Sequence, residues 1–219
     1  MYNYQSVRGA FNFGGARTVF TGTMTGITSG YYGVDITRVP DGVNGHVPAG
    51  TPIFVDDENR VADIHYAFEV VKGSTLAKTR VAKSLEGSRA WVGMNLMVMP
   101  ETIDGTGTAV AITAVDRSNA EYDILTHASL SVANAEGAIL VEADKAGEGA
   151  VIKVKPNGFL PYDYWKAPNA SEMRVDAIFA HTNGVLLTRR VPPIAPIIRE
   201  YLGDPNGGNT YFRYSKSRE

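Results

Sequence analysis

The sequence predicts a mainly β protein whose core is an antiparallel sandwich or barrel. The chain has 23 glycines and 11 prolines, and they are spread along it rather than bunched. Short runs rich in β-branched residues lie between them, and no long amphipathic helix precedes residue 190. Glycine and proline separate short strands by forming turns. Many short strands at such spacing are typical of a sandwich or a barrel.

We expect the β core to span residues 18–155. Residues 18–25 are rich in β-branched side chains, and residues 34–39 alternate between apolar and polar before a Pro-Asp-Gly turn. Both patterns are typical of half-buried strands. Further strands are expected over 52–55, 64–71, 90–99, 108–116, 122–126, 138–142 and 151–155. Acidic or glycine-containing turn signals separate them, among them 56–59 and 146–149.

Three other regions flank this core. Residues 1–17 form an expected extended N-terminal arm, and residues 156–173 form a connector rich in proline and aromatic residues. Residues 174–219 are expected to hold a C-terminal hairpin, a short helix and a tail. The hairpin would have strands over 174–180 and 185–190, because Asn183-Gly184 is a strong signal for a tight hairpin turn. The helix is expected over 194–202, with Pro196 in its first turn and Gly203 just past its end.

Composition narrows the function classes. The net charge is −2 and the chain has no cysteine, which excludes disulfides and thiolate metal sites and gives no support to bulk nucleic-acid binding. No apolar run approaches the roughly 18 residues that a membrane span needs. The first residues lack the blocks of a signal peptide, so we expect a soluble protein made in a cytosol. The C-terminal segment is mildly basic, which suits either an acidic protein surface or a solvated end; its cations are Arg189, Arg190, Arg199, Arg213, Lys216 and Arg218.

No motif favours catalysis or a cofactor. None of the four histidines, His46, His65, His127 and His181, lies at a metal-ligand spacing from another. The acidic run 56–59 lacks the spacing of a calcium loop and is typical of an exposed turn. Gly-x-Ser-x-Gly and the phosphate-binding loop are absent, and paired carboxylates for glycoside hydrolysis have no supporting motif. We therefore expect a protein that is not an enzyme and has no cofactor or metal site.

Two stretches resemble a known class of virion proteins. Residues 41–53 contain Ala49-Gly50-Thr51-Pro52 and are followed by an acidic turn and residues 61–63. They resemble the head decoration proteins and head-fibre bases of tailed phages. Residues 155–160, 176–179, 183–187 and 189–193 are similar to the C-terminal half of head-fibre or auxiliary capsid proteins in phages of gut Bacteroidetes, crAss-like phages among them. The region after Pro193 is longer than in the simplest decoration proteins.

The resemblance implies a structural virion protein on the outer surface of a tailed-phage capsid, made in the host bacterial cytoplasm. Its implied partners are the major capsid protein, copies of itself and another head-fibre protein, with neither nucleic acid nor membrane. Aromatic side chains in terminal segments supply contact area at low entropic cost, so we expect partner binding there and in the connector. The candidates are Tyr2, Tyr4, Phe11, Phe13, Tyr162, Tyr164, Trp165, Tyr211, Phe212 and Tyr214. The other interpretation is that these ends fold back on their own core.

A second function class remains open on the sequence. A carbohydrate-binding β module of a phage tail spike or an adhesin would use aromatic faces to stack on sugars. Trp91, Trp165 and the tyrosines of the connector are the residues that suggest it.

Overall fold

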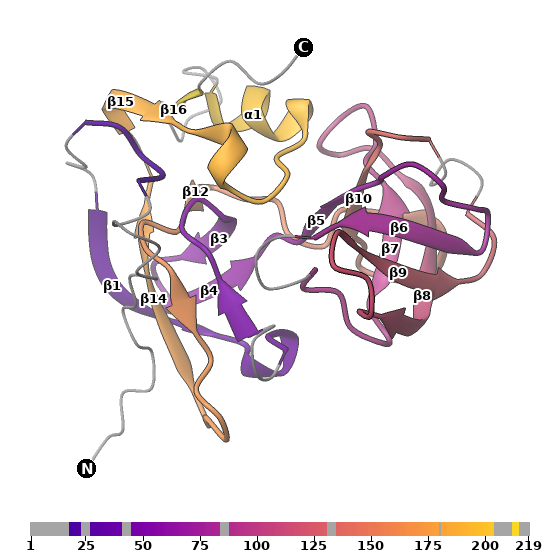
Figure 1. The fold of residues 1–219 in the computed structure, drawn as a ribbon. Coiled ribbons are helices and arrows are strands. Elements are labelled where there is room, and N and C mark those ends of the chain that lie inside the picture. The colour runs from indigo at the N-terminus through magenta and orange to yellow at the C-terminus, as the bar shows by residue number, and fades with distance from the viewer. Residues whose placement is uncertain are drawn as a thin grey trace. The chain divides into compact units, whose positions relative to one another are not determined.

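The computed structural model describes residues 18–22, 27–40, 45–83, 88–130, 135–179, 181–203 and 212–214; for residues 30, 181–184 and 212–214 it describes the main chain alone. The chain forms two compact units. Unit 1 comprises residues 1–64 and 156–219, and unit 2 comprises residues 65–155 (Figure 1). Unit 2 is therefore an insertion in the sequence of unit 1.

Unit 1 contains a closed barrel. Among the described residues its five strands follow one another around the barrel as β1 (Ile27–Val34), β14 (Met173–Ile178), β12 (Gly158–Phe159), β3 (Pro52–Asp56) and β4 (Val61–Ile64). β1 and β4 run parallel, and the other neighbours are antiparallel. Alternate side chains of a strand point to opposite faces, so Ile53 and Val55 of β3 are buried whereas Phe54 between them is exposed.

A helical turn replaces one expected strand in unit 1. The prediction of a strand over 34–39 is wrong, because Val34 ends β1 and η1 (Ile36–Arg38) is a 3-10 helix. The Asp35 carboxylate accepts two hydrogen bonds from Thr37, one from the main-chain N–H at 3.0 Å and one from the side-chain hydroxyl at 2.7 Å. This local capping competes with the extended conformation that the alternation of polarity suggests.

The C-terminal part of unit 1 contains the expected helix but not the expected hairpin. α1 (Pro196–Gly203) confirms the helix, and its Ile198 and Leu202 are buried. The hairpin is wrong: β15 (His181–Leu186) contains Asn183-Gly184 within the strand and pairs in parallel with β16 (Phe212–Tyr214). Ile178 of β14 already pairs with β1 on one side and with β12 on the other, so this end of β14 has no free edge for β15.

Unit 2 is a curled antiparallel sheet. Within the described residues its order is β5 (Ala67–Glu69), β10 (Ile139–Glu142), β7 (Asn95–Val98), β8 (Gly107–Asp116), β9 (Tyr122–His127) and β6 (Lys78–Ala82), with β11 (Gly147–Ala150) also paired to β8. A bridge between Val70 and Val81 brings the two edges of the sheet together. Met97, Val141 and Ile152 are buried in its core.

The mainly β class with a barrel core is thus confirmed. Several boundaries differ from those expected: His65 and Tyr66 interrupt the run 64–71, residues 147–150 form β11 instead of a turn, and residues 151–155 contribute only a bridge at Ile152. The expected core over 18–155 is divided between the two units, because β1 pairs with β14 and β3 pairs with β12, and both partners follow unit 2 in the sequence. The expected connector supplies β12 to the barrel. Within the described residues, no helix is long and apolar enough to cross a membrane.

Candidate functional site

Seven of the ten aromatic residues expected to bind a partner belong to segments whose side chains the structure does not describe. Residues 1–17 and Tyr211, and with them Tyr2, Tyr4, Phe11 and Phe13, lie outside the described residues. Phe212 and Tyr214 are known by their main chain, as the ends of β16. Their partner-binding role stays a prediction.

The connector aromatics divide between core and surface. Tyr164 is 2% exposed, and its hydroxyl accepts the main-chain N–H of Asp176 at 2.9 Å. It therefore packs in the core of unit 1 and does not present its ring to a partner, which corrects its assignment as a binding residue. Tyr162 and Trp165 are half-buried. They are the connector aromatics with surface left to offer.

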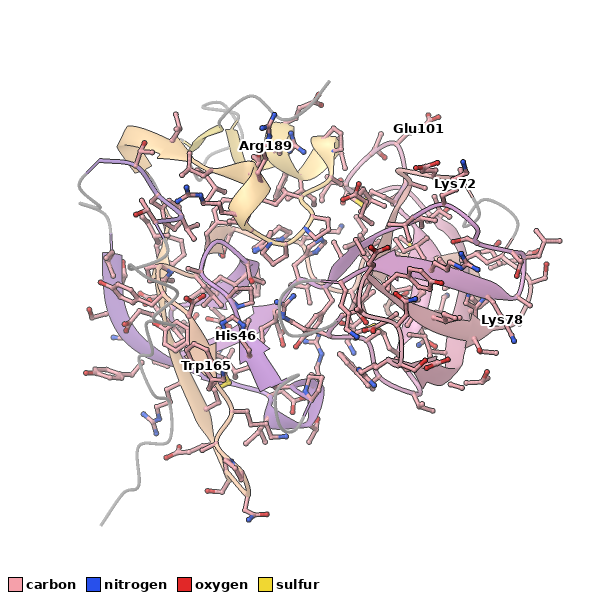
Figure 2. The ribbon with its side chains drawn as sticks, in the orientation of Figure 1. His46, Lys72, Lys78, Glu101, Trp165 and Arg189 are labelled. Carbon is pink, nitrogen blue, oxygen red and sulfur yellow. The ribbon has the colours of Figure 1, made fainter. Side chains whose placement is uncertain are left out.

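Trp165 belongs to an aromatic and charged cluster that holds the connector in place. β2 (His46–Val47) pairs with β13 (Tyr164–Trp165), and the His46 and Trp165 rings stack with centroids 4.3 Å apart and planes 20° apart (Figure 2). His46 Nε2 lies 3.3 Å from the Asp163 carboxylate, which also accepts the Ala49 N–H at 2.8 Å. His46 covers one face of Trp165, and the ring of Trp91 contacts Tyr66 edge-on at 5.2 Å. Both tryptophans thus serve packing within their own unit.

A buried ionic cluster in unit 2 surrounds Asp123. Asp123 is fully buried, accepts the Ser88 N–H at 2.7 Å and lies 3.2 Å from Lys83 Nζ. The same ammonium donates to the carbonyls of Arg117 at 2.9 Å and Asn119 at 2.8 Å. Lys83 therefore links the buried Asp123 carboxylate to the main chain through one ion pair and two hydrogen bonds. The cluster fixes the turn between β8 and β9.

The histidines of unit 2 are also used for structure. His127 Nε2 lies 2.8 Å from the Thr79 hydroxyl and its Nδ1 lies 2.6 Å from the Ala128 carbonyl. His65 Nδ1 lies 2.8 Å from the Val154 carbonyl, and burial lowers the pKa of His65 to about 4. Neutral His65 therefore donates its Nδ1 proton to Val154. In the part of the chain that the structure describes, no three histidines or carboxylates come together as metal ligands.

In the acidic turn between β3 and β4, Asp56 accepts hydrogen bonds from the turn itself. The Asp56 carboxylate accepts the side-chain N–H of Asn59 at 2.6 Å and the main-chain N–H groups of Glu58 and Asn59 at 3.0 Å. The hydrogen bond from the Asn59 side chain is the main cause of the lowered pKa of Asp56. This arrangement is that of an exposed turn, as the sequence indicated.

The arrangement that brings distant parts of the chain together is a small sheet, which we call the terminal sheet: residues 19–21, β15 and β16. The Leu187 N–H donates to the Val19 carbonyl at 2.9 Å and the Thr21 N–H donates to the Val185 carbonyl at 3.0 Å. Main-chain groups of successive residues in a strand point to alternate sides. Leu186 therefore faces β16, with which it pairs at Tyr214, and β15 is the central strand.

The register fixes where the remaining chain leaves the terminal sheet. Phe20 pairs with Leu186 antiparallel, so the chain toward residue 17 continues past the C-terminal end of β15. β16 runs parallel to β15 with Tyr214 opposite Leu186, so the chain beyond residue 214 continues at the same end. The segments 1–17 and 215–219 are therefore joined to the fold at one place. These segments and their neighbours carry most of the aromatic candidates.

Gly50 anchors the terminal sheet to the barrel. Its N–H donates to the Leu160 carbonyl at 2.8 Å, and its φ of +77° lies in the left-handed region. A Cβ added at Gly50 would overlap the Val191 side chain and lie 2.8 Å from Val19 Cγ1. Both valines thus pack directly on the turn that precedes β3.

The sequence indicated the Gly50 turn but not its partners. The Pro-Ala-Gly-Thr-Pro pattern marks a turn, whereas nothing local marks the pairing of residues 19–21 with residues 185–187. Comparisons of the chain with protein-family models, curated proteins and solved structures found no match.

Proposed function

We propose that the chain is a structural virion protein, without enzymatic activity, that binds the outside of a tailed-phage capsid. It acts there as an auxiliary or decoration protein or as a head-fibre base. The observation that carries the proposal is the common exit of segments 1–17 and 215–219 from one end of the terminal sheet. Because the two arms start at one place, both can bind the same site on a partner. Binding through both arms then fixes the orientation of the fold on that partner.

The chemistry of these segments supports such binding. Tyr2, Tyr4, Phe11 and Phe13 lie in the first arm, and Tyr211, Phe212 and Tyr214 lie in or beside β16. Tyrosine and phenylalanine are enriched at protein interfaces, and extended chain adds readily to the edge of a partner's sheet. A repetitive capsid offers the same site many times, so the major capsid protein and copies of this chain are the proposed partners, and nucleic acid and membrane are not.

The rest of the fold supports a scaffold role. The polar clusters at Asp123, His127 and Asp163 are engaged by neighbours within their own units. The Asp56 carboxylate is likewise engaged by hydrogen bonds from its own turn. The Gly50 turn, which lies in the stretch that resembles phage decoration proteins, holds the terminal sheet against the barrel. Because Val19 and Val191 pack on this turn, arms that are bound to a partner also hold the barrel of unit 1 in place.

Co-sedimentation with assembled heads of the phage that encodes the chain tests the proposal. We expect the intact chain to sediment with heads, and a variant that lacks residues 1–17 to remain largely in the supernatant. Lys72→Glu, an exposed change in unit 2, is the control and should bind as the intact chain does. Absence of binding by the intact chain contradicts the capsid role, and full binding by the shortened variant contradicts anchoring through the first arm.

A further inference from the structure

We infer that the outer face of β1, β4 and β3 binds residues 1–17 of a second copy of this chain. The inference rests on the proposed function, which places copies of the chain next to one another on a repetitive surface, and it names the contact between them. β4 pairs with β1 on one side and with β3 on the other, so the three strands form one continuous face.

Three large apolar side chains of this outer face are exposed to solvent. Tyr31 of β1 is 55% exposed, Val61 of β4 is 45% exposed and Phe54 of β3 is 40% exposed. Their neighbours Tyr32 and Ala62 are buried, because alternate side chains of a strand point to opposite faces. Exposed apolar side chains that are grouped on one face mark a site of interaction with another molecule.

Gly33 leaves an open position among these side chains. It pairs with Val61 and lies two residues after Tyr31 in β1. A Cβ added at Gly33 would meet only the Arg60 carbonyl, at 3.8 Å, which is an ordinary van der Waals distance. The outer face therefore has room at Gly33 for a side chain that comes from a partner.

The main chain at Tyr31 is a second sign of a binding surface. Its φ of +49° lies in the left-handed region, which bulky residues rarely adopt. β1 has a bulge there, in which residues 29–31 lie opposite Asp176 alone. Strained main chain is concentrated at binding and catalytic sites, so the exposed Tyr31 marks this part of the barrel for recognition.

The outer face has an acidic border. Residues 27–38 and 52–64, which contain the three strands, carry five acidic and two basic residues, a net charge of −3. Both basic residues form ion pairs with carboxylates of the same ranges. Arg174, which lies beside Gly33 in β14, is paired with Glu172 at 3.2 Å and adds no net charge. The border therefore favours a cationic partner.

Residues 1–17 have the complementary composition. They contain Arg8 and Arg17 and no acidic residue. Their four aromatic residues form two pairs whose members are two positions apart, Tyr2 with Tyr4 and Phe11 with Phe13. In an extended chain such residues lie on one face, about 7 Å apart. Val61 and Phe54 are diagonal neighbours on their strands, and such neighbours have about the same separation.

The proposed role supplies the second copy. Two identical outer faces carry charge of the same sign, so they repel each other and do not pair directly. The cationic and aromatic arm of a neighbour is the matching surface that another copy offers. On a capsid, many such contacts between neighbours act together, so that each can be weak and still strengthen attachment.

The test measures self-association of the intact chain by analytical ultracentrifugation over a range of concentrations. Phe54→Thr with Val61→Thr removes apolar side chains from the outer face. Leu76→Thr with Val92→Thr makes the same kind of change at exposed residues of unit 2 and serves as the matched control. Equal melting temperatures establish that each variant is folded.

A second variant and a peptide keep the test independent of any one substitution. Gly33→Gln fills the open position with a polar side chain and removes no apolar contact. A synthetic peptide of residues 1–17, added in excess, competes with the arm of the second copy. Binding to assembled heads is measured separately for every variant.

We expect the intact chain to associate as its concentration rises and the peptide to return it to monomer. Both outer-face variants should associate at least about tenfold more weakly. The control should match the intact chain, and added salt should weaken association.

An intact chain that stays monomeric at every concentration overturns the inference, and so does association that is unchanged in the outer-face variants. Peptide binding that appears only after deletion of residues 1–17 shows that each face holds its own arm, which also overturns it. Head binding by a monomeric chain overturns this inference and leaves the capsid role standing. Self-association through the outer face without head binding supports this inference and contradicts the capsid role.

Discussion

The side-chain amide of Asn157 forms two hydrogen bonds with the main chain of Val55, one in each direction. Its Oδ1 accepts the Val55 N–H at 2.9 Å, and its Nδ2 donates to the Val55 carbonyl at 2.9 Å. The main-chain N–H of Asn157 donates to the Ile53 carbonyl at 2.9 Å. The amide thus imitates one more residue of the short strand β12 beside β3. It does so where the chain returns from unit 2 to unit 1.

Asn157→Asp should destabilise unit 1 by about 2 kcal/mol. An aspartate keeps the acceptor for the Val55 N–H but replaces the donor with an oxygen that faces the Val55 carbonyl. Asn119→Asp is the matched control, because Asn119 Oδ1 only accepts N–H groups, from Glu121 and Tyr122. Urea unfolding followed by the fluorescence of Trp165, with Trp91→Phe in the background, measures the effect of Asn157→Asp. The control lies in unit 2 and is followed by Trp91, with Trp165→Phe in the background. Equal midpoints for Asn157→Asp and the parent chain would contradict the role of the amide.

Gly50→Ala should be more costly than Gly93→Ala. Both glycines have positive φ, +77° and +95°, so alanine adds backbone strain of about 1 kcal/mol at each. A Cβ at Gly50 also overlaps Val191 and crowds Val19, whereas a Cβ at Gly93 meets nothing within 4 Å. Overpacking of this kind adds about 1–3 kcal/mol. Thermal unfolding of the two variants gives the comparison. Equal decreases in melting temperature would show that Val19 and Val191 move aside without loss of stability.

The sequence was informative where structure depends on local signals. The run 52–55 became β3, the run 122–126 became β9, and Pro196 with Gly203 marked α1. Each of these follows from periodicity or from a turn or cap within a few residues. The same local reasoning failed at Asn183-Gly184, because the partner of β15 is β16 and the neighbouring edge of β14 is already paired.

Long-range pairing is what the sequence did not reveal. The insertion of unit 2 follows from β12 and β14 completing a barrel that β1, β3 and β4 begin. A single sequence gives no sign that residues so far apart are neighbours in space. The terminal sheet has the same origin, since the pairing of Phe20 with Leu186 has no local signature. Tyr164 was assigned to a surface for its residue type and proved buried because β13 pairs with β2.

His65 should make stability depend on pH between about 4 and 6.5. Burial lowers its pKa from the ordinary 6.5 to about 4 in the folded chain, so in this range the unfolded chain binds a proton that the folded chain does not. The contribution of neutral His65 to the free energy of unfolding is fully present above pH 6.5. The free energy of unfolding falls by up to about 3 kcal/mol as the pH drops to 4. His65→Gln keeps a donor for Val154 and does not titrate. Urea midpoints of both chains across this range test the prediction, and parallel curves would refute it.

Lys83→Met should strongly destabilise unit 2. It leaves the buried Asp123 carboxylate without its nearest cation and frees the carbonyls of Arg117 and Asn119, a change that costs about 3–5 kcal/mol. Lys155 pairs with Asp104 at the surface, so Lys155→Met should cost less than about 1 kcal/mol. The fluorescence of Trp91, with Trp165→Phe in the background, reports both. Similar losses of stability in the two variants would contradict the role of Lys83 as the counter-ion of Asp123.

Unit 1 should fold without unit 2. Ile64 at the end of β4 and Gly158 at the start of β12 both pair with Ile53, from opposite sides. Neighbouring strands lie about 4.8 Å apart, so Ile64 and Gly158, which flank the insertion, are only about 10 Å apart. A linker of about six glycines and serines spans this distance easily. The strand pairs of unit 1 need nothing from residues 65–155.

We therefore expect a chain in which such a linker replaces residues 65–155 to keep a cooperative transition at Trp165. Its dependence on urea should be shallower, because less surface is exposed on unfolding. Residues 65–155 produced alone should likewise unfold cooperatively at Trp91, since the bridge between Val70 and Val81 brings the edges of their sheet together. A shortened chain whose Trp165 emission matches that of the urea-unfolded state would show that the barrel depends on the insertion.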